Sequence, residues 1–355
     1  MAEPTALDLR ADVVALTAAL VDIPSESRHE ARLADLVQAA LAAEDHLEVT
    51  RVRNNVVART VLGRDSRVLI GGHLDTVPSA GNLPHHFDGA ELFGLGSCDM
   101  KGGVAVMLHA AAALTRPDRD VTYVFYECEE IEETANGLRH LAETSPELLA
   151  ADFAVLMEPS NAQIEAGCQG TLRAVVTTHG RRSHSARAWM GHNAVHEAAE
   201  ILNRLAAYEP AEVEIDGLTY REGLNAVGIQ GGIAGNVIPD RCEVTVNYRF
   251  APDQDIPAAK RHVEEIFEGF PVAFVDEAPG ALPGLTVPAA REFISVIGRP
   301  PAPKFGWTDV ARFAALGIPA VNYGPGDPAF AHAPDEHVPV EQIRACAGTV
   351  TSWLS

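Results

Sequence analysis

The chain has 355 residues, and at roughly 150 residues per domain this length predicts two domains, each with its own core. Hydrophobic residues make up 47% and charged residues 21%, a balance typical of a folded globular protein and not of a disordered or fibrous one. Acidic residues outnumber basic ones by 49 to 27, and the formal charge of −22 argues against nucleic acid or an anionic membrane as a partner.

The first 170 residues alternate between helical and strand patterns. Apolar residues at helical spacing predict a helix over 9–20, and Ser27 with Glu30 forms a capping-box pattern before a second helix that includes 33–41. The predicted elements that follow are strands over 55–61 and 68–70, a helix over 103–114, a strand over 121–126, a helix near 138 and a strand over 153–157. This alternation is typical of an α/β domain, in which reactive groups follow the ends of strands.

A second, smaller domain is predicted between residues 171 and 280. Its order is strand 172–178, helix 194–207, strands 226–232 and 243–250, helix 256–267 and strand 272–275, which is the ferredoxin-like β-α-β-β-α-β unit. A Gly- and Pro-rich linker over 280–288 then precedes another strand of the first domain over 319–323. We therefore expect residues 1–170 and 281–355 to form one domain, with 171–280 inserted into it.

The cysteines and the hydropathy pattern bear on location. The five cysteines have no paired spacing, which favours reduced thiols over disulfides or a cysteine zinc site. We find neither a signal-peptide pattern nor an uncharged run of membrane-spanning length. The expected location is the cytoplasm.

Potential metal ligands follow the predicted strands of the first domain. Imidazoles and carboxylates without thiolates suit zinc in a catalytic site, and five groups suffice for two ions if one carboxylate bridges them. An isolated His-x-Asp or Glu-Glu pair is usually a surface feature, so the prediction depends on the repeated placement at strand ends and at a helix start. The candidates are His73 in HLDTVP, Asp99 before a glycine-opened helix, Glu129 and Glu130 in YECEEIEE, Glu158 in LMEPS and His332 in GPGDPAFAHAPDEH.

Glu129 and Glu130 are predicted to divide two tasks. Adjacent carboxylates are costly to keep ionised unless a cation neutralises one, so one of the pair should bind metal and the other act as general base and acid. Asp75, two residues after His73, is placed to accept a hydrogen bond from the imidazole nitrogen that faces away from the metal. Cys128 is interpreted as a small buried residue and not as a nucleophile.

Taken together, HLDTVP, GLGSCDMKGG, the CEE triplet, MEP and the late His332 resemble, in order and spacing, a zinc peptidase and acylase family. This family includes succinyl-diaminopimelate desuccinylase, acetylornithine deacetylase, aminoacylase and glutamate carboxypeptidases. The resemblance covers essentially the whole chain. It implies an α/β zinc-peptidase-like catalytic domain with a central, mostly parallel sheet, and an inserted ferredoxin-like α+β lid domain through which residues 171–280 form a homodimer.

The resemblance also implies a ligand set for two Zn²⁺ ions per subunit, with Co²⁺ or another divalent ion as an alternative in one site. Asp99 would bridge the two ions, His73 and Glu158 would complete one site, and Glu130 and His332 the other.

Further roles follow from the same resemblance. Glu129 becomes the general base, and His184 in RRSHSARAW reaches the partner subunit's site to stabilise the tetrahedral oxyanion. Asn236, Arg249 and Thr308 are expected to bind substrate, and Arg249 suits a carboxylate because a guanidinium pairs with it through two hydrogen bonds.

Within the family, phrases such as CEEIEETANGL, AGNVIPDRCEVTVNYRF and AHAPDEHVP are most similar to the actinobacterial type of succinyl-diaminopimelate desuccinylase. This implies hydrolysis of N-succinyl-LL-2,6-diaminopimelate to succinate and LL-diaminopimelate, in lysine and diaminopimelate biosynthesis. Two segments depart from the proteobacterial type: Cys168 and Gln169 replace a basic pair, and KFGWTDVARF replaces a threonine- and glycine-rich loop. Both departures concern substrate recognition, so the identity of the acyl-amino acid stays open.

Two alternatives accompany this hypothesis. The first is an acetylornithine deacetylase or another N-acyl-amino-acid deacylase, which would share the zinc chemistry. The second is a noncatalytic zinc-stabilised binding protein. Glu129 and Asp75 argue against the second, because a structural metal site has closed coordination and needs no spare base.

Overall fold

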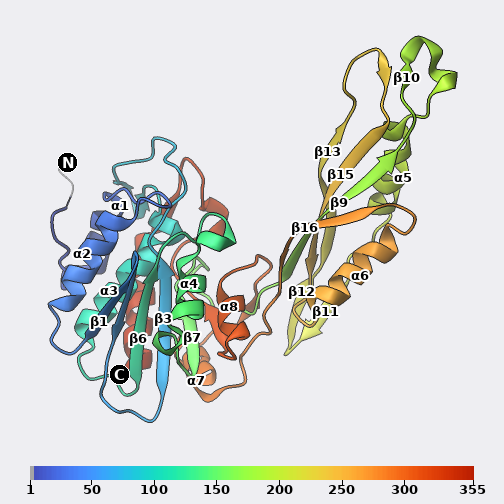
Figure 1. Ribbon diagram of the computed structural model, residues 1–355. Coiled ribbons are helices and arrows are strands. Elements are labelled where there is room, and N and C mark those ends of the chain that lie inside the picture. Colours follow the sequence, from blue (N-terminus) through green and yellow to red (C-terminus); the bar gives the residue numbers. More distant parts are fainter. Residues whose placement is uncertain (1–3) are drawn as a thin grey trace. The chain divides into compact units, whose positions relative to one another are not determined.

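The computed structural model describes residues 4–355, which divide into two compact units (Figure 1). Unit 1 contains the described residues up to Ala166, together with Pro283–Ala302 and Arg312–Ser355. Unit 2 contains Gly167–Leu282 and Pro303–Ala311. The predicted insertion over 171–280 lies inside unit 2.

One short segment differs from the predicted division. Residues 303–311, expected to belong with 281–355, are part of unit 2. Hydrogen bonds hold the segment there: the Lys304 carbonyl accepts from the Gln169 amide, and the Trp307 indole donates to the Pro279 carbonyl. Sequence patterns did not indicate these long-range contacts.

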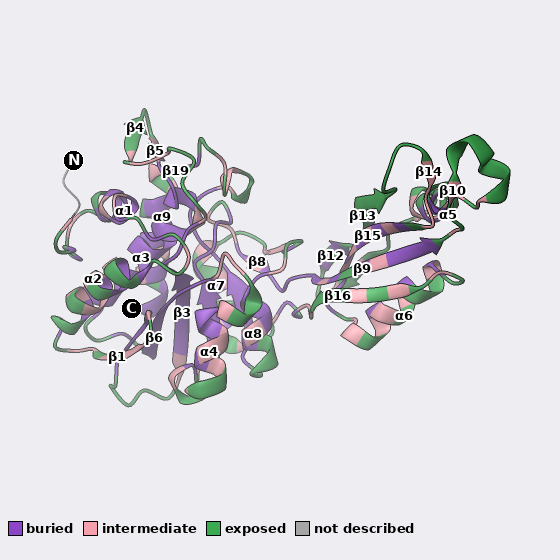
Figure 2. Ribbon diagram, turned by 45° about the horizontal axis from the view of Figure 1, so that its top comes forward, coloured by how far each residue is buried: buried purple, intermediate pink, exposed green. Residues whose placement is uncertain are grey.

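Unit 1 is built on an eight-stranded sheet. The four central strands β6, β3, β7 and β18 are parallel, and β1, β2 and β8 add antiparallel neighbours. The central strands are buried over almost their whole length (Figure 2), as expected for parallel strands covered on both faces. In sheet order the strands are β1 (Glu48–Val52), β2 (Asn55–Arg59), β6 (Asp120–Tyr126), β3 (Arg67–His73), β7 (Phe153–Leu156), β18 (Ala320–Asn322), β8 (Glu165–Ala166) and β17 (Ala302–Pro303).

Helices cover this sheet. Helix α3 is buried along most of its length because it packs between α1 and α9 and also contacts β3, while α2 packs on β1 and β2. The helices are α1 (Val13–Val21), α2 (Ala31–Ala42), α3 (Gly102–Ala113), α4 (Gly137–Thr144), α7 (Pro288–Ile297), α8 (Val310–Ala315) and α9 (Val340–Leu354). A small sheet of β19 (His337–Pro339), β5 (Glu91–Phe93) and β4 (His86–Asp88) completes the unit.

Unit 2 has the predicted ferredoxin-like arrangement. Its antiparallel sheet has the order β13 (Gly223–Gly231), β15 (Arg241–Phe250), β9 (Gly170–His179), β16 (Val272–Ala278). Helices α5 (Ala194–Ala206) and α6 (Ile256–Ile266) cover one face of this sheet (Figure 1), where alternate residues of β15 enter the core. Two additional antiparallel strand pairs were not predicted: the hairpin of β11 (Glu212–Ile215) with β12 (Leu218–Arg221), and the long-range pair of β10 (Ser183–His184) with β14 (Val237–Ile238).

None of the helices within residues 4–355 combines the length and the apolar composition needed to cross a lipid bilayer.

Candidate metal centre and active site

Three parallel strands deliver the first polar residues to one edge of the unit 1 sheet. His73 is the last residue of β3 and pairs in register with Tyr126, the last residue of β6. On the other side of β3, Gly71 pairs with Leu156 at the end of β7. Because the strands are parallel, the Glu129–Glu130 loop after β6 and Glu158 after β7 emerge at the same edge as His73.

The structure brings four of the five predicted metal ligands together around the carboxylate of Asp99. One oxygen, Oδ1, lies 3.1 Å from His73 Nε2, and the other, Oδ2, lies 3.4 Å from His332 Nε2. The same His332 nitrogen lies 2.9 Å from Oε1 of Glu130. Glu158 is buried, and its negative charge is among the causes that raise the pKa of His73. Residues separated by more than 250 positions in the sequence therefore converge on one cluster.

This cluster fits one or two divalent cations. The ligand atoms of His73, Asp99 and Glu130 all lie within 4.8 Å of one another. Neutral imidazoles and ionised carboxylates are the usual oxygen and nitrogen ligands of catalytic zinc. The Asp99 carboxylate, with one oxygen toward each histidine, has the arrangement expected of a group between two ions.

The pKa values of the two histidines and of Asp99 are shifted by their contacts with one another. Hydrogen bonds to Asp99 and Glu130 raise the pKa of His332 to about 10. Burial opposes the charged form of His73, but hydrogen bonds to Asp75 and Asp99 still raise the pKa of His73 well above its ordinary value. Burial likewise opposes ionisation of Asp99, yet the two histidines lower the pKa of its carboxyl. The histidines and carboxylates of the cluster therefore each favour the charged form of the other.

Asp75 organises the loop after β6 more than it orients His73. The nearest acceptor for His73 Nδ1 is the backbone carbonyl of Asp75 at 3.0 Å, whereas the Asp75 carboxylate is 3.5 Å away. That carboxylate accepts hydrogen bonds from the amides of Glu129 at 2.9 Å and Glu130 at 3.1 Å, and from the Ser27 hydroxyl at 2.7 Å. The prediction placed Asp75 behind the histidine; the structure adds that it fixes the backbone of the Glu129–Glu130 pair.

The prediction that Ser27 and Glu30 cap a helix is wrong. Helix α2 begins at Ala31, but no side chain caps it, because the Ser27 hydroxyl donates to Asp75. The Glu30 carboxylate instead accepts from the amides of Arg28 at 2.7 Å and Cys128 at 3.2 Å. Both side chains therefore form hydrogen bonds with residues next to the metal cluster and not with the first turn of α2.

Glu336 is a site residue that the sequence analysis missed. Its buried carboxylate accepts the backbone N–H groups of Gly96 at 2.9 Å and of Cys98 and Asp99 at 3.0 Å. These contacts hold the segment that presents the Asp99 side chain, while burial raises the pKa of Glu336 to about 7. Its place in AHAPDEHVP, four residues after His332, was the available signal.

The remaining predicted residues, His184, Asn236, Arg249 and Thr308, all belong to unit 2. His184 is exposed, and its Nδ1 accepts the Ala186 amide at 3.0 Å. The Asn236 carbonyl accepts the Ser185 amide at 2.9 Å, so His184 and Asn236 lie in neighbouring loop segments.

Arg249 is a half-buried cation without a carboxylate partner. It lies on the inner strand β15, and no ion pair or hydrogen bond to its guanidinium is found within residues 4–355. Burial, and then the charge of Arg173, lower the pKa of Arg249. Arg249 therefore does not form a structural salt bridge within the described residues. Thr308 is buried as well, and its hydroxyl has no hydrogen-bond partner in the described part of the chain.

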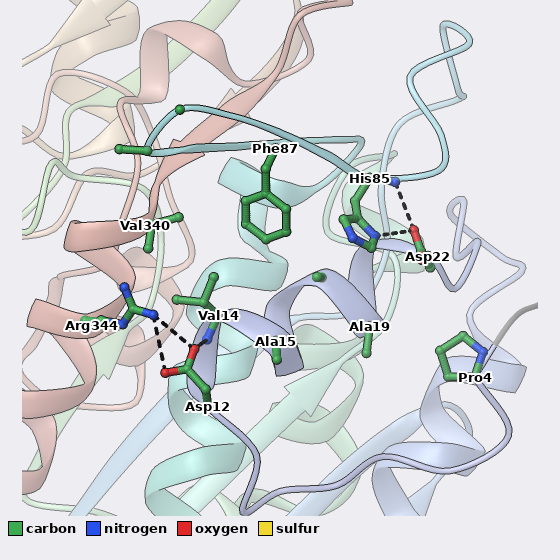
Figure 3. Close-up of a pocket in the computed structure, with 13 residues that line it drawn as sticks. Pro4, Asp12, Val14, Ala15, Ala19, Asp22, His85, Phe87, Val340 and Arg344 are labelled. Carbon is green, nitrogen blue, oxygen red and sulfur yellow. Dashed lines mark hydrogen bonds and ion pairs between the residues drawn. The ribbon is translucent and has the colours of Figure 1, made fainter. Parts of the chain in front are cut away.

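A separate pocket of unit 1, of about 780 Å³, lies over α1 (Figure 3). Its lining includes Phe87 and several alanines, and none of the predicted site residues. Its polar groups already pair with one another, Asp12 with Arg344 and Asp22 with His85. We therefore assign the chemistry to the strand-end cluster and not to this pocket.

A mostly parallel sheet with imidazoles and carboxylates at its strand ends, together with an inserted ferredoxin-like unit, defines a class of metal-dependent hydrolases. The chain belongs to Peptidase family M20/M25/M40, whose family model matches residues 69–355. This confirms the family and the fold that the motifs predicted.

Curated relatives extend the match to nearly the whole chain. DapE of Mycobacterium tuberculosis is 56% identical over 351 residues, covering 98% of this chain and 99% of the relative. Succinyl-diaminopimelate desuccinylase of Corynebacterium glutamicum is 50% identical over 360 residues, covering 98% of each. Among solved structures, the Bacillus subtilis YXEP protein, described as a dinuclear metal binding peptidase, matches in fold with a TM-score of 0.73 and 17% identity, covering 98% of this chain and 97% of that one.

Proposed function

We propose that the protein hydrolyses N-succinyl-LL-2,6-diaminopimelate to succinate and LL-diaminopimelate, a step of lysine and diaminopimelate biosynthesis. The observation that carries the proposal is the Asp99 carboxylate held between His73 and His332, with Glu130 against the second histidine. The choice of substrate follows from the 50% identity to the C. glutamicum enzyme of that name.

The proposed cofactors are two Zn²⁺ ions, with Co²⁺ or another divalent ion as an alternative in one site. Asp99 would bridge them, His73 and Glu158 would bind one, and Glu130 and His332 the other. Bound there, the ions would supply Lewis acidity toward water and toward the amide carbonyl.

Glu129 is the proposed general base and acid. It would take the proton of the attacking water and deliver it to the leaving amine, which is the work of a single positioned carboxylate. Its backbone is anchored by the Asp75 carboxylate, and its neighbour Glu130 faces His332. These contacts support the division of the pair into base and ligand.

Substrate recognition is proposed to depend on unit 2. Arg249 is a partly desolvated cation with no internal partner, and on a chain with a formal charge of −22 it suits a substrate carboxylate. The unsatisfied hydroxyl of Thr308 and the side chain of Asn236 are proposed to bind the remaining polar groups of the substrate. His184, carried on an exposed loop, is proposed to stabilise the oxyanion in the partner subunit.

A homodimer through unit 2 is part of the proposal. Strand β13 is an edge strand of its sheet, and its residues Val227 and Ile229 are 60% and 52% exposed. Nearby segments of the unit also expose large apolar side chains, including Ile233 at 66% and Trp189 at 78%. An exposed apolar edge strand is a template for pairing with a second chain. Light scattering of the purified protein tests the dimer, which Ile229→Lys would weaken.

The proposed location is the cytoplasm, since all five cysteines are unpaired and buried.

The test is hydrolysis of N-succinyl-LL-diaminopimelate by the metal-loaded protein, measured beside N-acetyl-ornithine. We expect the succinyl substrate to have the higher kcat/KM. Glu129→Gln should retain folding and metal content while kcat falls by about 10²–10⁴-fold. Glu143→Gln is the matched control, because Glu143 is an exposed glutamate paired only with Arg139 on a helix surface. Near-normal turnover of Glu129→Gln, or a preference for the acetyl substrate, would contradict the respective assignment.

A further inference from the structure

A second cluster of potential ligands lies in unit 1 and uses none of the residues of the first. The carboxylates of Glu30 and Glu127 and the thiol of Cys128 have ligand atoms that all lie within 4.8 Å of one another. All three residues are buried, with exposed fractions of 0%, 7% and 5%. Glu30 precedes α2 and the other two follow β6, so the cluster joins two segments that are far apart in the sequence.

The cluster has an unsatisfied buried oxygen. Oε1 of Glu30 accepts from the Arg28 amide, the Cys128 amide and the Cys128 thiol, the last two at 3.2 Å. Oε2 of the same carboxylate is fully buried and has no hydrogen-bond partner within residues 4–355. A buried carboxylate oxygen left without a partner loses its hydration with nothing in exchange, so its presence needs a ligand or an explanation.

The charge balance of the cluster points to a cation. Burial, and then the negative charge of Glu30, raise the pKa of Glu127, although hydrogen bonding from Asn54 and the positive charge of Arg53 oppose this. Within residues 4–355 no basic side chain forms an ion pair with Glu30 or Glu127, and Arg53 acts on Glu127 only through its charge. Two buried carboxylates this close are costly to ionise together unless a cation lies between them.

The geometry is close to what a single ion requires. Zinc binds thiolate at about 2.3 Å and carboxylate at about 2.0–2.2 Å, so two ligands of one ion are at most about 4.5 Å apart. The three side chains therefore need to close only slightly. One thiolate with two carboxylates favours a borderline or soft ion over Mg²⁺ or Ca²⁺, which take oxygen ligands alone.

We propose that Glu30, Glu127 and Cys128 form a further cation site that binds one thiophilic divalent ion of the Zn²⁺, Co²⁺ or Cd²⁺ class. The Cys128 proton leaves to solvent as the metal–sulfur bond forms. The ion ties the start of α2 to the loop that carries Glu129 and Glu130, so its occupancy stabilises that loop. The proposal goes beyond the proposed hydrolase, whose ligands are nitrogen and oxygen atoms only.

The experiment is titration of the full-length protein with Co²⁺ and with Cd²⁺, followed by ultraviolet absorption. A metal–thiolate bond gives a charge-transfer band, whereas ions held by imidazole and carboxylate give none. We expect a band that saturates with one equivalent of ion beyond those bound by the first cluster. Cys128→Ser should abolish it, Glu30→Gln should weaken apparent affinity by about tenfold or more, and Cys242→Ser, at a buried cysteine of unit 2, should leave it unchanged.

In the titration, either of two results would overturn the proposal: no band at saturating Co²⁺ and Cd²⁺, or a band that persists in Cys128→Ser. Because Glu30→Gln also disturbs two backbone hydrogen bonds, a second measurement uses the unaltered protein. Cd²⁺ should slow alkylation of Cys128, mapped by mass spectrometry, relative to Cys242, and equal rates with and without Cd²⁺ would contradict the site. Neither the charge-transfer band nor the alkylation rate depends on hydrolytic activity. The cation site and the proposed hydrolase can therefore be refuted independently.

Discussion

Replacement of Asp75 by asparagine tests how the catalytic loop is held. The substitution keeps the size of the side chain but removes its charge and turns one acceptor oxygen into an NH₂ donor. Oδ1 of Asp75 accepts the Glu129 amide, and Oδ2 accepts the Glu130 amide and the Ser27 hydroxyl. Whichever way the new amide turns, at least one N–H of the loop faces another donor.

The expected loss follows from these contacts. A hydrogen bond to a charged group contributes about 1.5–3 kcal/mol, so losing one and weakening the others should cost about 2–4 kcal/mol of folding free energy. At about 2–4 °C per kcal/mol for a domain of this size, the Tm of unit 1 should fall by about 4–16 °C. Because Glu130 is also a proposed metal ligand, metal affinity should fall by about 10–100-fold.

Thermal melting followed by circular dichroism, with and without Zn²⁺, measures the first effect, and competition with a chelator measures the second. Asp88→Asn is the control, since Asp88 is an exposed aspartate of β4. The His73 contact to the Asp75 backbone carbonyl survives the substitution, but His73 loses the charge of the Asp75 carboxylate 3.5 Å away. A loss of affinity therefore reports on the Glu129–Glu130 loop and on His73 together, whereas the fall in Tm reports on the lost loop hydrogen bonds. A variant with wild-type Tm and wild-type metal affinity would refute the reasoning.

Two further predictions concern the frame around the site. Burial favours the neutral form of Asp120, but the amides of Leu62 and Arg64 lower the pKa of its carboxyl below the ordinary value. The ionised Asp120 therefore stabilises the folded protein above about pH 4, and this stabilisation is lost as pH falls through the folded-state pKa. Asp120→Asn should therefore lower stability by about 1–3 kcal/mol at pH 7 in urea unfolding, and a loss that persists undiminished at pH 3 would contradict this. A Cβ added at Gly103 would lie 2.2 Å from the Met157 carbonyl oxygen, so Gly103→Ala must shift the backbone next to a proposed ligand. We expect a cost of about 1–3 kcal/mol or more together with weaker zinc binding, and an unchanged melting curve would show that the contact relaxes freely.

The strand ends were predictable because their signal is local. The run at 153–157 is continuously apolar and the run at 121–126 is interrupted only by Thr122, as is typical of strands buried on both faces, and the two runs correspond to β7 and β6. Once such strands are parallel, residues that follow them meet at one edge, which places His73 near the Glu129–Glu130 loop. Asp99, before a glycine-opened helix, and His332 were candidates by their positions, but their roles as bridging and terminal ligands came from the family resemblance and not from any periodic pattern.

The misses share a physical cause, since each depends on contacts between distant parts of the chain. Glu336 reaches donors 237 to 240 positions away, and its place four residues after His332 marks it as near the site without indicating which backbone groups it binds. The pattern of Ser27 and Glu30 is a good local capping signal, but partners on other elements outcompete the helix end for both side chains. The same holds for residues 303–311, which join unit 2 through hydrogen bonds that sequence patterns do not reveal.

The interrupted connectivity of unit 1 has a consequence for biosynthesis. Strand β18, which pairs with β7, and His332, which meets Asp99, lie beyond the inserted unit. At synthesis rates of about 5–20 residues per second, the ribosome needs about 9–35 seconds between making Glu158 and making His332. During that interval the nascent amino-terminal half has an open sheet edge and an incomplete set of ligands. A newly made chain should thus acquire its full complement of metal only near release, and chaperones that shield the β7 edge should engage it before then.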